Sequence, residues 1–368
     1  MAVPFIDITR EIKLDLSSYE EAAHRVICSG TFLLGPEVAQ FEEDFAKTLH
    51  VKHVIAVSNG TLALYASLLA LDIGHGDEVI VPTNSFIATA EAVVMTGARP
   101  VFCDVDPTTY HVSLAQAERL CTPKTKAIIP VHLYGRIMEM GPLQEIATRK
   151  NLRIIEDACQ AHGASMDGKY AGTIGDVGCF SFYPTKNLGA LGEGGAVVTN
   201  SDELAERLRG VRVHGSLREK YRHDFFGSNL RMEALQGAFL SIKLKRLQAG
   251  NERRQEIADR YRDGLQGLPL VLPPALPKDQ HVYHLFVIQV SDRGALQTRL
   301  EAKGIHTAIH YPIPIHLQPA MAAYSEGVGS CPEAEKLSEV ILSLPLFSMM
   351  MDEEISQVIQ AVREHYGV

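Results

Sequence analysis

The stretch SFYPTKNLGALGEGG, residues 181–195, holds a single lysine in a largely uncharged segment. Lys186 is the only charged residue between Asp176 and Glu193, and several glycines follow it. Glycines let a backbone approach a bulky group closely. Burial lowers the pKa of a lysine, and the resulting neutral amine is a nucleophile that can form a Schiff base. An isolated lysine after a strand is more often a solvated surface residue, so the partners of Lys186 decide the interpretation.

The segments around this stretch alternate between short apolar runs and helical patterns, which indicates an α/β domain. The apolar runs lack polar alternation, as expected of parallel strands that are buried on both faces. The predicted strands are residues 53–57, 78–82, 100–105, 126–132, 152–158, 178–183 and 195–200. The predicted helices are residues 16–29, one that starts at Gly35-Pro36, then 62–71, 85–96, 113–120, 143–150 and 201–211.

The last third of the chain predicts a second, smaller unit. A polar loop at residues 212–229 precedes one long predicted helix, residues 231–265. The proline-rich segment 269–277 then marks a domain boundary. A strand is predicted at 281–290, and helices are predicted at 295–303, 333–342 and 353–365. We therefore expect a large domain at residues 1–265, including an extended N-terminal arm, and a small α+β domain at residues 266–368.

The composition limits the partners and the compartment. The net charge of −9 disfavours nucleic acid and an anionic membrane as main partners. No apolar run reaches the ~18–20 residues of a membrane span, and the N-terminus lacks a signal-peptide pattern. The six cysteines show no CxxC spacing, and the dispersed histidines include no HExxH, so no metal is expected. We expect a cytoplasmic protein with reduced thiols.

Two segments offer partners for the lysine. The segment IIEDACQAHGA, residues 154–164, places acidic side chains at the carboxyl end of a predicted parallel strand, where ligands bind in open α/β sheets. Glu156 and Asp157 point to opposite faces, so they have different roles. Residues 58–61, Ser-Asn-Gly-Thr, join a strand to a helix, where backbone N–H groups can hold an anion. Taken alone, each segment is more simply a strand end or a helix cap.

Three further sets of side chains are candidates for ligand contacts. Phe86 follows the second predicted strand and can stack on a planar ring, although an isolated aromatic residue is more often core. Asn229 and Arg231 close the polar loop and suit an anionic ligand, unless Asn229 caps the next helix. The third set is a polar cluster in a proline-rich loop, which either binds substrate or occupies the surface: His310, Tyr311 and His316.

A reactive lysine, an acid and an anion site are what pyridoxal 5'-phosphate (PLP) requires. The chain resembles, in order and over nearly its whole length, the DegT-type (DegT/StrS) family of PLP-dependent nucleotide-sugar aminotransferases of fold type I. Two residues depart from the family pattern, namely Cys159 and Asn84. The matching segments are SNGTLAL (58–64), GDEVIVP (76–82), FIATAEA (86–92), AIIPVHLYG (127–135), IIEDACQAHGA (154–164), FSFYPTKNLGALGEGGAVVT (180–199), GSNLRM (227–232), HVYHLF (281–286) and IHYPIPIHLQPA (309–320).

The resemblance implies a large, mainly parallel seven-stranded sheet domain, a small C-terminal domain, and a homodimer with active sites at the subunit interface. It implies that Lys186 forms a Schiff base with PLP and then moves protons, and that Asp157 keeps the pyridine nitrogen protonated. His162 is expected to support the site from behind. The other implied cofactor contacts are Phe86 on the ring, Gln160 near the ring hydroxyl, Gly60, Thr61 and Ser181 at the phosphate, and the partner subunit's Asn229.

The resemblance also implies a ping-pong transamination, in which glutamate leaves its nitrogen as pyridoxamine 5'-phosphate and a nucleoside-diphosphate keto-sugar collects it. The YPIPIHLQPA segment favours a dTDP-3-keto-6-deoxyhexose and a 3-amino sugar for polysaccharide or secondary-metabolite biosynthesis. The candidate substrate contacts are His162, Arg222, Arg231, His310, Tyr311 and His316.

Alternatives to this substrate and this activity stay open. An aminotransferase for a UDP- or GDP-linked 4-keto-sugar or for an inosose is one, and a non-catalytic regulatory protein of the same fold is another. A sugar dehydratase of this fold is disfavoured, because such relatives carry histidine in place of the Schiff-base lysine.

Overall fold

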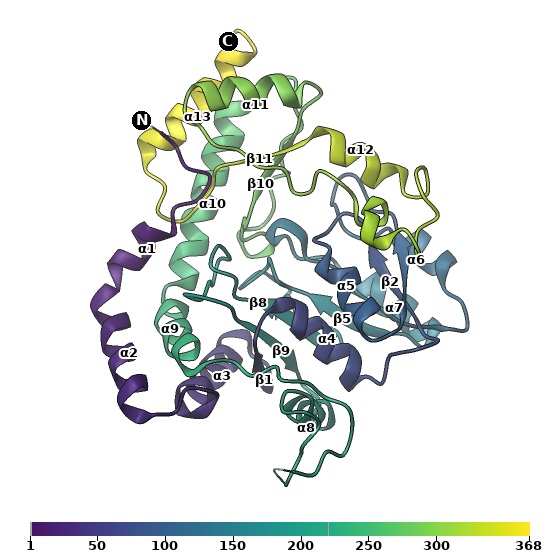
Figure 1. Ribbon diagram of the computed structural model, residues 1–368. Helices are drawn as coiled ribbons and strands as arrows, with labels where there is room; N and C mark the ends of the chain where they lie inside the picture. Colours follow the sequence, from purple (N-terminus) through teal and green to yellow (C-terminus); the bar gives the residue numbers. More distant parts are fainter. Residues whose placement is uncertain (1, 220) are drawn as a thin grey trace.

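The computed structural model describes residues 2–219 and 221–368, and it is built around one large sheet (Figure 1). The strand order is β1-β9-β8-β5-β4-β2-β3. Neighbouring strands are parallel, except that β9 runs antiparallel to both β1 and β8. The predicted seven-stranded, mainly parallel sheet is therefore confirmed. Its strands are β1 (His53–Val57), β2 (Glu78–Pro82), β3 (Arg99–Cys103), β4 (Thr125–Ile128), β5 (Arg153–Asp157), β8 (Val177–Ser181) and β9 (Gly195–Thr199).

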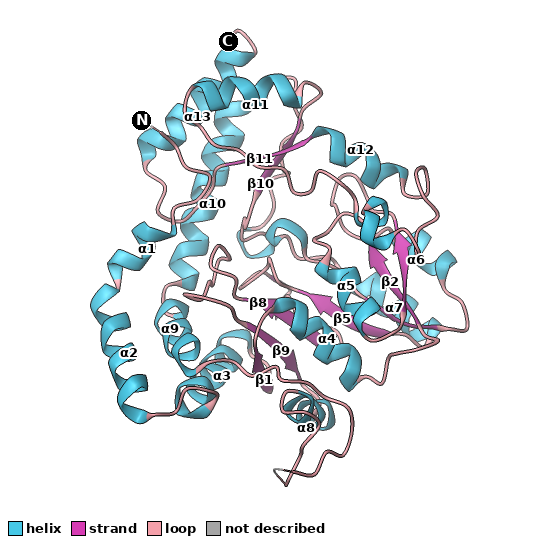
Figure 2. Ribbon diagram, in the orientation of Figure 1, coloured by secondary structure: helices cyan, strands magenta, loops and turns pink. Residues whose placement is uncertain are grey.

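Helices cover both faces of this sheet, because alternate strand residues enter different cores (Figure 2). In β1, Ile55 and Val57 pack in the core beneath α4, α5 and α8, whereas Val54 and Ala56 face α3 on the other side. Helices α6 and α7 cover the same side as α3, over β2, β4 and β5. The covering helices are α3 (Gly35–Leu49), α4 (Gly60–Ala70), α5 (Ala88–Met95), α6 (Leu114–Leu120), α7 (Met140–Lys150) and α8 (Asp202–Val211).

The single long helix predicted at residues 231–265 is wrong. Two helices occupy this stretch, α9 (Ala234–Leu244) and α10 (Leu247–Leu265). They serve different cores: Leu240 of α9 packs with α3 and the large sheet, whereas Tyr261 of α10 packs with the C-terminal strands. Lys245 and Arg246 separate the two helices, and a periodicity summed over both does not reveal that break.

A second, two-stranded antiparallel sheet forms the C-terminal part, with α11 and α13 beside it (Figure 1). The sequence predicted a strand at 281–290 and a helix at 333–342, whereas the second strand of this sheet, β11, was missed. The apolar run Ile341–Leu344 pairs with β10 and is buried, so it extends instead of continuing the helix. The elements are β10 (Phe286–Gln289), α11 (Arg293–Ala302), α12 (Pro332–Val340), β11 (Ile341–Leu344) and α13 (Asp352–His365).

The N-terminal arm lies against the C-terminal part, and the two termini lie near each other (Figure 1). Val3 pairs with the backbone around Ile305 and is buried in the core that contains α13. Arg10 donates to the buried carboxylate of Glu354 at 2.7 and 2.8 Å. The division at residue 265 remains a prediction. The other short elements are α1 (Ile8–Leu14), α2 (Leu16–Ser29), β6 (Ser165–Met166), β7 (Lys169–Tyr170), and 3₁₀ turns at Leu133–Gly135, Lys278–Gln280, Ile315–Leu317 and Pro319–Met321.

Candidate active site

The turn that carries Lys186 joins two paired strands of the large sheet. Residues 182–194, which we term the Lys186 turn, connect the end of β8 to the start of β9, and Ser181 pairs with Gly195 at its base. The Lys186 N–H donates to the Tyr183 carbonyl at 2.8 Å. Within this turn, residue 189 has to be glycine, because a Cβ there would lie 2.3 Å from the Pro184 carbonyl oxygen. The backbone of the turn therefore fixes the position of the Lys186 Cα.

The Lys186 amine lies in a low-dielectric setting next to acidic groups. Burial lowers the pKa of its ammonium, and the Cys159 thiol and the Asp157 carboxyl oppose that shift. The side chain is half-buried, so a ligand can reach it. Burial thus favours the neutral, nucleophilic form of the amine more than water does.

Asp157 lies at the end of β5, one strand from β8, and the two strands end at the same edge of the sheet. Its carboxylate accepts from the Thr89 hydroxyl at 2.9 Å and from the Cys159 N–H at 3.2 Å. The neighbouring Glu156 is on the other face, fully buried, and accepts from His132 at 2.8 Å and from three backbone N–H groups. The predicted division of roles between the two acids agrees with this arrangement.

The predicted anion turn lies directly beside the base of the Lys186 turn. Asn59 caps α4 by accepting from the Leu62 N–H at 2.9 Å. Gly60 follows, and a Cβ there would lie 2.6 Å from the Ser181 Cβ. The structure thus brings Gly60, Thr61 and Ser181 together at the N-terminus of an 11-residue helix, where backbone N–H groups favour an anion.

The next group of predicted residues forms a wall beside the carboxyl ends of β2 and β5. Gln160 accepts from the Tyr134 N–H at 2.7 Å and donates to the Tyr311 hydroxyl at 3.2 Å. The Phe86 ring lies 5.9 Å from the Tyr311 ring, and 54% of Phe86 is exposed. That exposure argues against the core interpretation of Phe86, because a buried-core aromatic would be covered. Tyr134 was not singled out from the sequence.

Several histidines surround the lysine and are neutral. Burial lowers the pKa of His310 to about 4 and that of His162 to about 3, and the Lys186 charge lowers each pKa further. Burial and the Lys186 charge likewise lower the pKa of His284, whose Nδ1–H donates to the Asn187 side-chain oxygen at 3.3 Å. His284 was missed by the sequence reasoning, although it lies in the quoted HVYHLF segment.

Two predicted substrate contacts are not available to a ligand in this arrangement. His162 has no exposed surface, and its ring lies between Phe180 and Phe182. His316 is equally buried and bonds to Glu335 at 3.0 Å. We therefore treat both residues as supports rather than as direct contacts.

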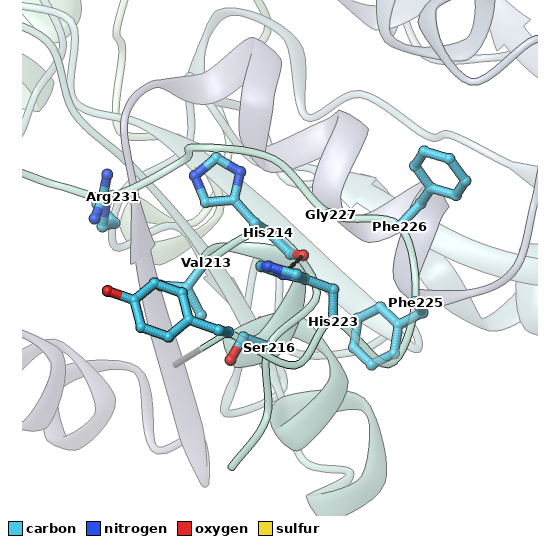
Figure 3. Close-up of a pocket in the computed structure, with 9 residues that line it drawn as sticks. Val213, His214, Ser216, His223, Phe225, Phe226, Gly227 and Arg231 are labelled. Atoms are coloured by element: carbon cyan, nitrogen blue, oxygen red, sulfur yellow. Dashed lines mark hydrogen bonds between the residues drawn. The ribbon is translucent and has the colours of Figure 1, made fainter. Parts of the chain in front are cut away.

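The remaining predicted residues lie in the polar loop, residues 212–229, or just after it at Arg231, and this segment borders a hollow of about 1070 Å³ (Figure 3). The exposed Arg222 pairs with Asp224 at 2.9 Å, and Arg231 donates to the Asn229 side chain at 2.8 Å. In Figure 3 the side chains of Arg231 and Phe226 lie far apart along the loop. Asn229 does not cap α9, whose N-cap is Glu233.

The described residues hold neither a metal cluster nor a membrane-spanning helix. In residues 2–219 and 221–368, no group of three or more His, Cys, Asp or Glu side chains is placed to hold a metal ion. No helix in these ranges is both long enough and apolar enough to cross a membrane.

Comparison with known proteins identifies the family. A model of the DegT/DnrJ/EryC1/StrS aminotransferase family matches residues 16–363. The chain belongs to this family. The family predicted from the motifs is confirmed, and with it the expectation that the chain is an aminotransferase.

Relatives in this family match almost end to end. The chain is 45% identical to the dTDP-3-amino-3,4,6-trideoxy-α-D-glucose transaminase of Streptomyces venezuelae, over 98% of this chain and 96% of that one. It is 43% identical to the UDP-N-acetyl-3-dehydro-α-D-glucosamine 3-aminotransferase of Acidithiobacillus ferrooxidans, over 98% and 97%. The crystal structure of S. venezuelae DesV in complex with a ketimine intermediate superimposes with a TM-score of 0.96 at 43% identity, covering 100% of this chain and 99% of that one.

Proposed function

We propose that the chain uses PLP to transfer the amino group of an amino acid, with glutamate the expected donor, to a keto-sugar linked to a nucleoside diphosphate. The observation that carries this proposal is the Lys186 amine, whose pKa burial lowers, beside the Asp157 carboxylate. A binding protein of the same fold would have no use for a reactive amine there.

The residues around Lys186 fit PLP. A phosphate suits the α4 N-terminus, where Gly60 leaves no room for a side chain and Ser181 adds a hydroxyl. Asp157 can bond to a protonated ring nitrogen, Phe86 offers an uncovered aromatic face, and Gln160 lies nearby. When bound, PLP supplies an electron sink that stabilises negative charge at the carbon bonded to the transferred nitrogen.

The protein's own contribution is binding and proton transfer. With PLP bound, the Lys186 Nζ would be the group that takes a proton and returns it at a neighbouring carbon, since burial lowers its pKa. Asp157 would accept a hydrogen bond from the protonated pyridine nitrogen of PLP. Hydrogen bonds from the Thr89 hydroxyl and the Cys159 N–H fix its carboxylate for that role. Neutral histidines around Lys186 add no competing positive charge at neutral pH.

We also propose a homodimer in which the partner subunit's Asn229 completes each site. Support comes from exposed apolar side chains beside the polar loop: Phe226 is 92% exposed, Phe32 55% and Leu33 47%. Residues 32–34 pair with residues 232–234, so Phe32 and Leu33 lie at the end of that loop. Exposed apolar side chains that gather on one face are typical of a protein contact surface.

The proposed acceptor is a 3-keto-sugar. The two relatives described above are named for amination at carbon 3, although one acts on a dTDP-sugar and the other on a UDP-sugar. We assign His310 and Tyr311 to the sugar, because both lie in the wall around Lys186. The guanidinium groups of Arg222 and Arg231 suit the diphosphate and would act from the partner subunit.

The experiment begins with the purified protein and PLP. We expect a long-wavelength absorbance band that L-glutamate abolishes, followed by recovery of the band with a keto-sugar. A panel of dTDP-, UDP- and GDP-linked 3-keto and 4-keto sugars, read by mass spectrometry, identifies the acceptor. Transamination by Lys186→Ala at the wild-type rate would refute the proposal. A protein that binds PLP but aminates no sugar would favour the regulatory alternative.

A further inference from the structure

Ser343 is a buried polar residue on an otherwise apolar strand. In β11, Leu342 and Leu344 pack into the C-terminal core beside α13, whereas Ser343 alternates to the other side. Ser343 has no exposed surface, and its backbone exchanges two hydrogen bonds with Ala308, at 2.8 and 3.2 Å. An apolar side chain would fill this strand position equally well, so the hydroxyl needs a separate explanation.

The hydroxyl is directed at His310. Ser343 Oγ lies 2.8 Å from His310 Nδ1, and this is its only side-chain hydrogen bond among the described residues. If Nδ1 carried the proton and donated to Oγ, the serine hydrogen would be buried without an acceptor. If the serine donates to Nδ1, both groups are satisfied. The geometry therefore selects the tautomer of His310 in which Nε2 carries the hydrogen.

The rest of the chain holds both the imidazole and the backbone of this segment. The Phe5 ring of the N-terminal arm stacks on it, with the centroids 5.7 Å apart and the planes 25° apart. The His310 carbonyl accepts from the Tyr134 hydroxyl, and the next residue, Tyr311, accepts from Gln160 at 3.2 Å. His310 Nε2 has no partner in residues 2–219 and 221–368, and it is not sealed from solvent.

We propose that Ser343 is a positioning residue that holds His310 with Nε2–H directed to a substrate oxygen. The oxygen belongs to the keto-sugar, at its carbonyl or at an adjacent hydroxyl, so this inference rests on the proposed function. Burial and the nearby Lys186 charge keep the imidazole neutral, which leaves it a donor at Nε2 and an acceptor at Nδ1. A neutral imidazole in this state gives one hydrogen bond to substrate without adding a charge.

The tautomer is tested without turnover, by NMR of the holoenzyme labelled with ¹⁵N-histidine. The ring nitrogens of His310 are assigned by their loss in His310→Asn. We expect the wild-type spectrum to show Nε2–H, and Ser343→Ala to shift His310 toward a mixture of tautomers. Ser338→Ala is the matched control, because among the described residues the hydroxyl of that buried serine in α12 bonds only to the Glu335 carbonyl. A wild-type Nδ1–H tautomer, or an unchanged tautomer in Ser343→Ala, would overturn the proposal.

Half-reactions measure the consequence for substrate. We expect Ser343→Ala to slow the keto-sugar half-reaction about tenfold, more than it slows the amino-donor half-reaction, as for other residues that orient a ligand-binding histidine. Ser343→Thr, which keeps the hydroxyl, should restore the wild-type tautomer and rate. Equal slowing of both half-reactions would contradict the assignment to the sugar. If no keto-sugar reacts even with the wild type, the proposed function fails, whereas the NMR result still decides the tautomer.

Discussion

The Lys186 turn and the polar loop differ in how many contacts their functional side chains make within the same chain. In the Lys186 turn, backbone contacts, burial and the neighbouring Asp157 all come from the same chain. In the polar loop, Arg222, Asn229 and Arg231 bond mainly to near neighbours, and Phe226 is almost fully exposed. The difference supports the proposal made above, in which one chain builds the reactive centre and a second subunit contributes to substrate recognition and to completion of the site.

The largest effect is expected at the Lys186 turn. Lys186→Ala removes the amine that binds the cofactor and moves the proton, so the transamination rate should fall about a thousandfold. Single-turnover absorbance with glutamate, and mass detection of the amino sugar, measure the loss. The control is Lys169→Ala, since Lys169 is exposed in the β6–β7 hairpin. A loss of less than tenfold would mean that another group moves the proton.

Asp157→Asn should lower the rate about a hundredfold, because a neutral amide cannot stabilise a protonated ring nitrogen. Asparagine keeps the size of the side chain and can still accept one of the two hydrogen bonds from Thr89 and the Cys159 N–H. The change should also shift the absorbance of bound PLP. Asp167→Asn, at an exposed hairpin position, is the control. Wild-type absorbance and rate in Asp157→Asn would place the pyridine nitrogen elsewhere.

The proposed cross-subunit role of Asn229 tests directly whether the polar loop acts on the site of the other subunit. Asn229→Ala should weaken PLP retention about tenfold through loss of one hydrogen bond to phosphate. Mixed with Lys186→Ala and allowed to exchange subunits, it should recover about a quarter of the wild-type sites, because half of the dimers then carry one intact site. No recovery would mean that Asn229 serves its own chain. Glu233→Gln, just outside the loop, is the control.

Short-range patterns predicted the sheet, since apolar runs identified all seven strands. Separate motifs singled out Lys186, Asp157 and Gly60, and the family resemblance added Ser181. The fold brings these residues together, and their roles remain predictions. Long-range packing was harder to predict: β11 was missed because its apolar run resembles the end of a helix. The break between α9 and α10 separates residues of two cores, and each core is formed by segments that lie far apart in the sequence.

Side-chain environment was the least predictable part of the site. His162 and His316 looked like ligand contacts, yet both are buried, whereas Tyr134 and His284 lie near the site but were not singled out within their quoted segments. A histidine's exposure depends on residues from several distant segments. The sequence therefore predicted which segments meet, and the structure was needed to separate contacts from supports.

A smaller effect is expected from the exposed face of the polar loop. Phe226→Ser removes an aromatic side chain from the proposed subunit contact, so the dimer dissociation constant should rise about tenfold or more. Analytical ultracentrifugation over a concentration series measures it. Val328→Ser, at a residue that is 83% exposed in the C-terminal part, is the control. Equal effects of the two substitutions would place the contact surface elsewhere.

The smallest effect concerns the stability of the cofactor-free protein and isolates the burial of Lys186. The folded-state pKa of Lys186 lies below its usual value of 10.5, so the unfolded chain binds more protons between those two values. Stability should therefore rise with pH through that alkaline window.

Lys186→Met keeps the length of the side chain but removes the charge, and it should flatten this rise in urea unfolding measured at several pH values. Lys169→Met should leave the wild-type slope unchanged, because an exposed ammonium is solvated in both states. If the free energy of unfolding changed with pH equally in wild type and Lys186→Met, Lys186 would be as well solvated as Arg222 and Arg231 of the polar-loop region. The contrast between the two regions would then lie in the cofactor contacts alone.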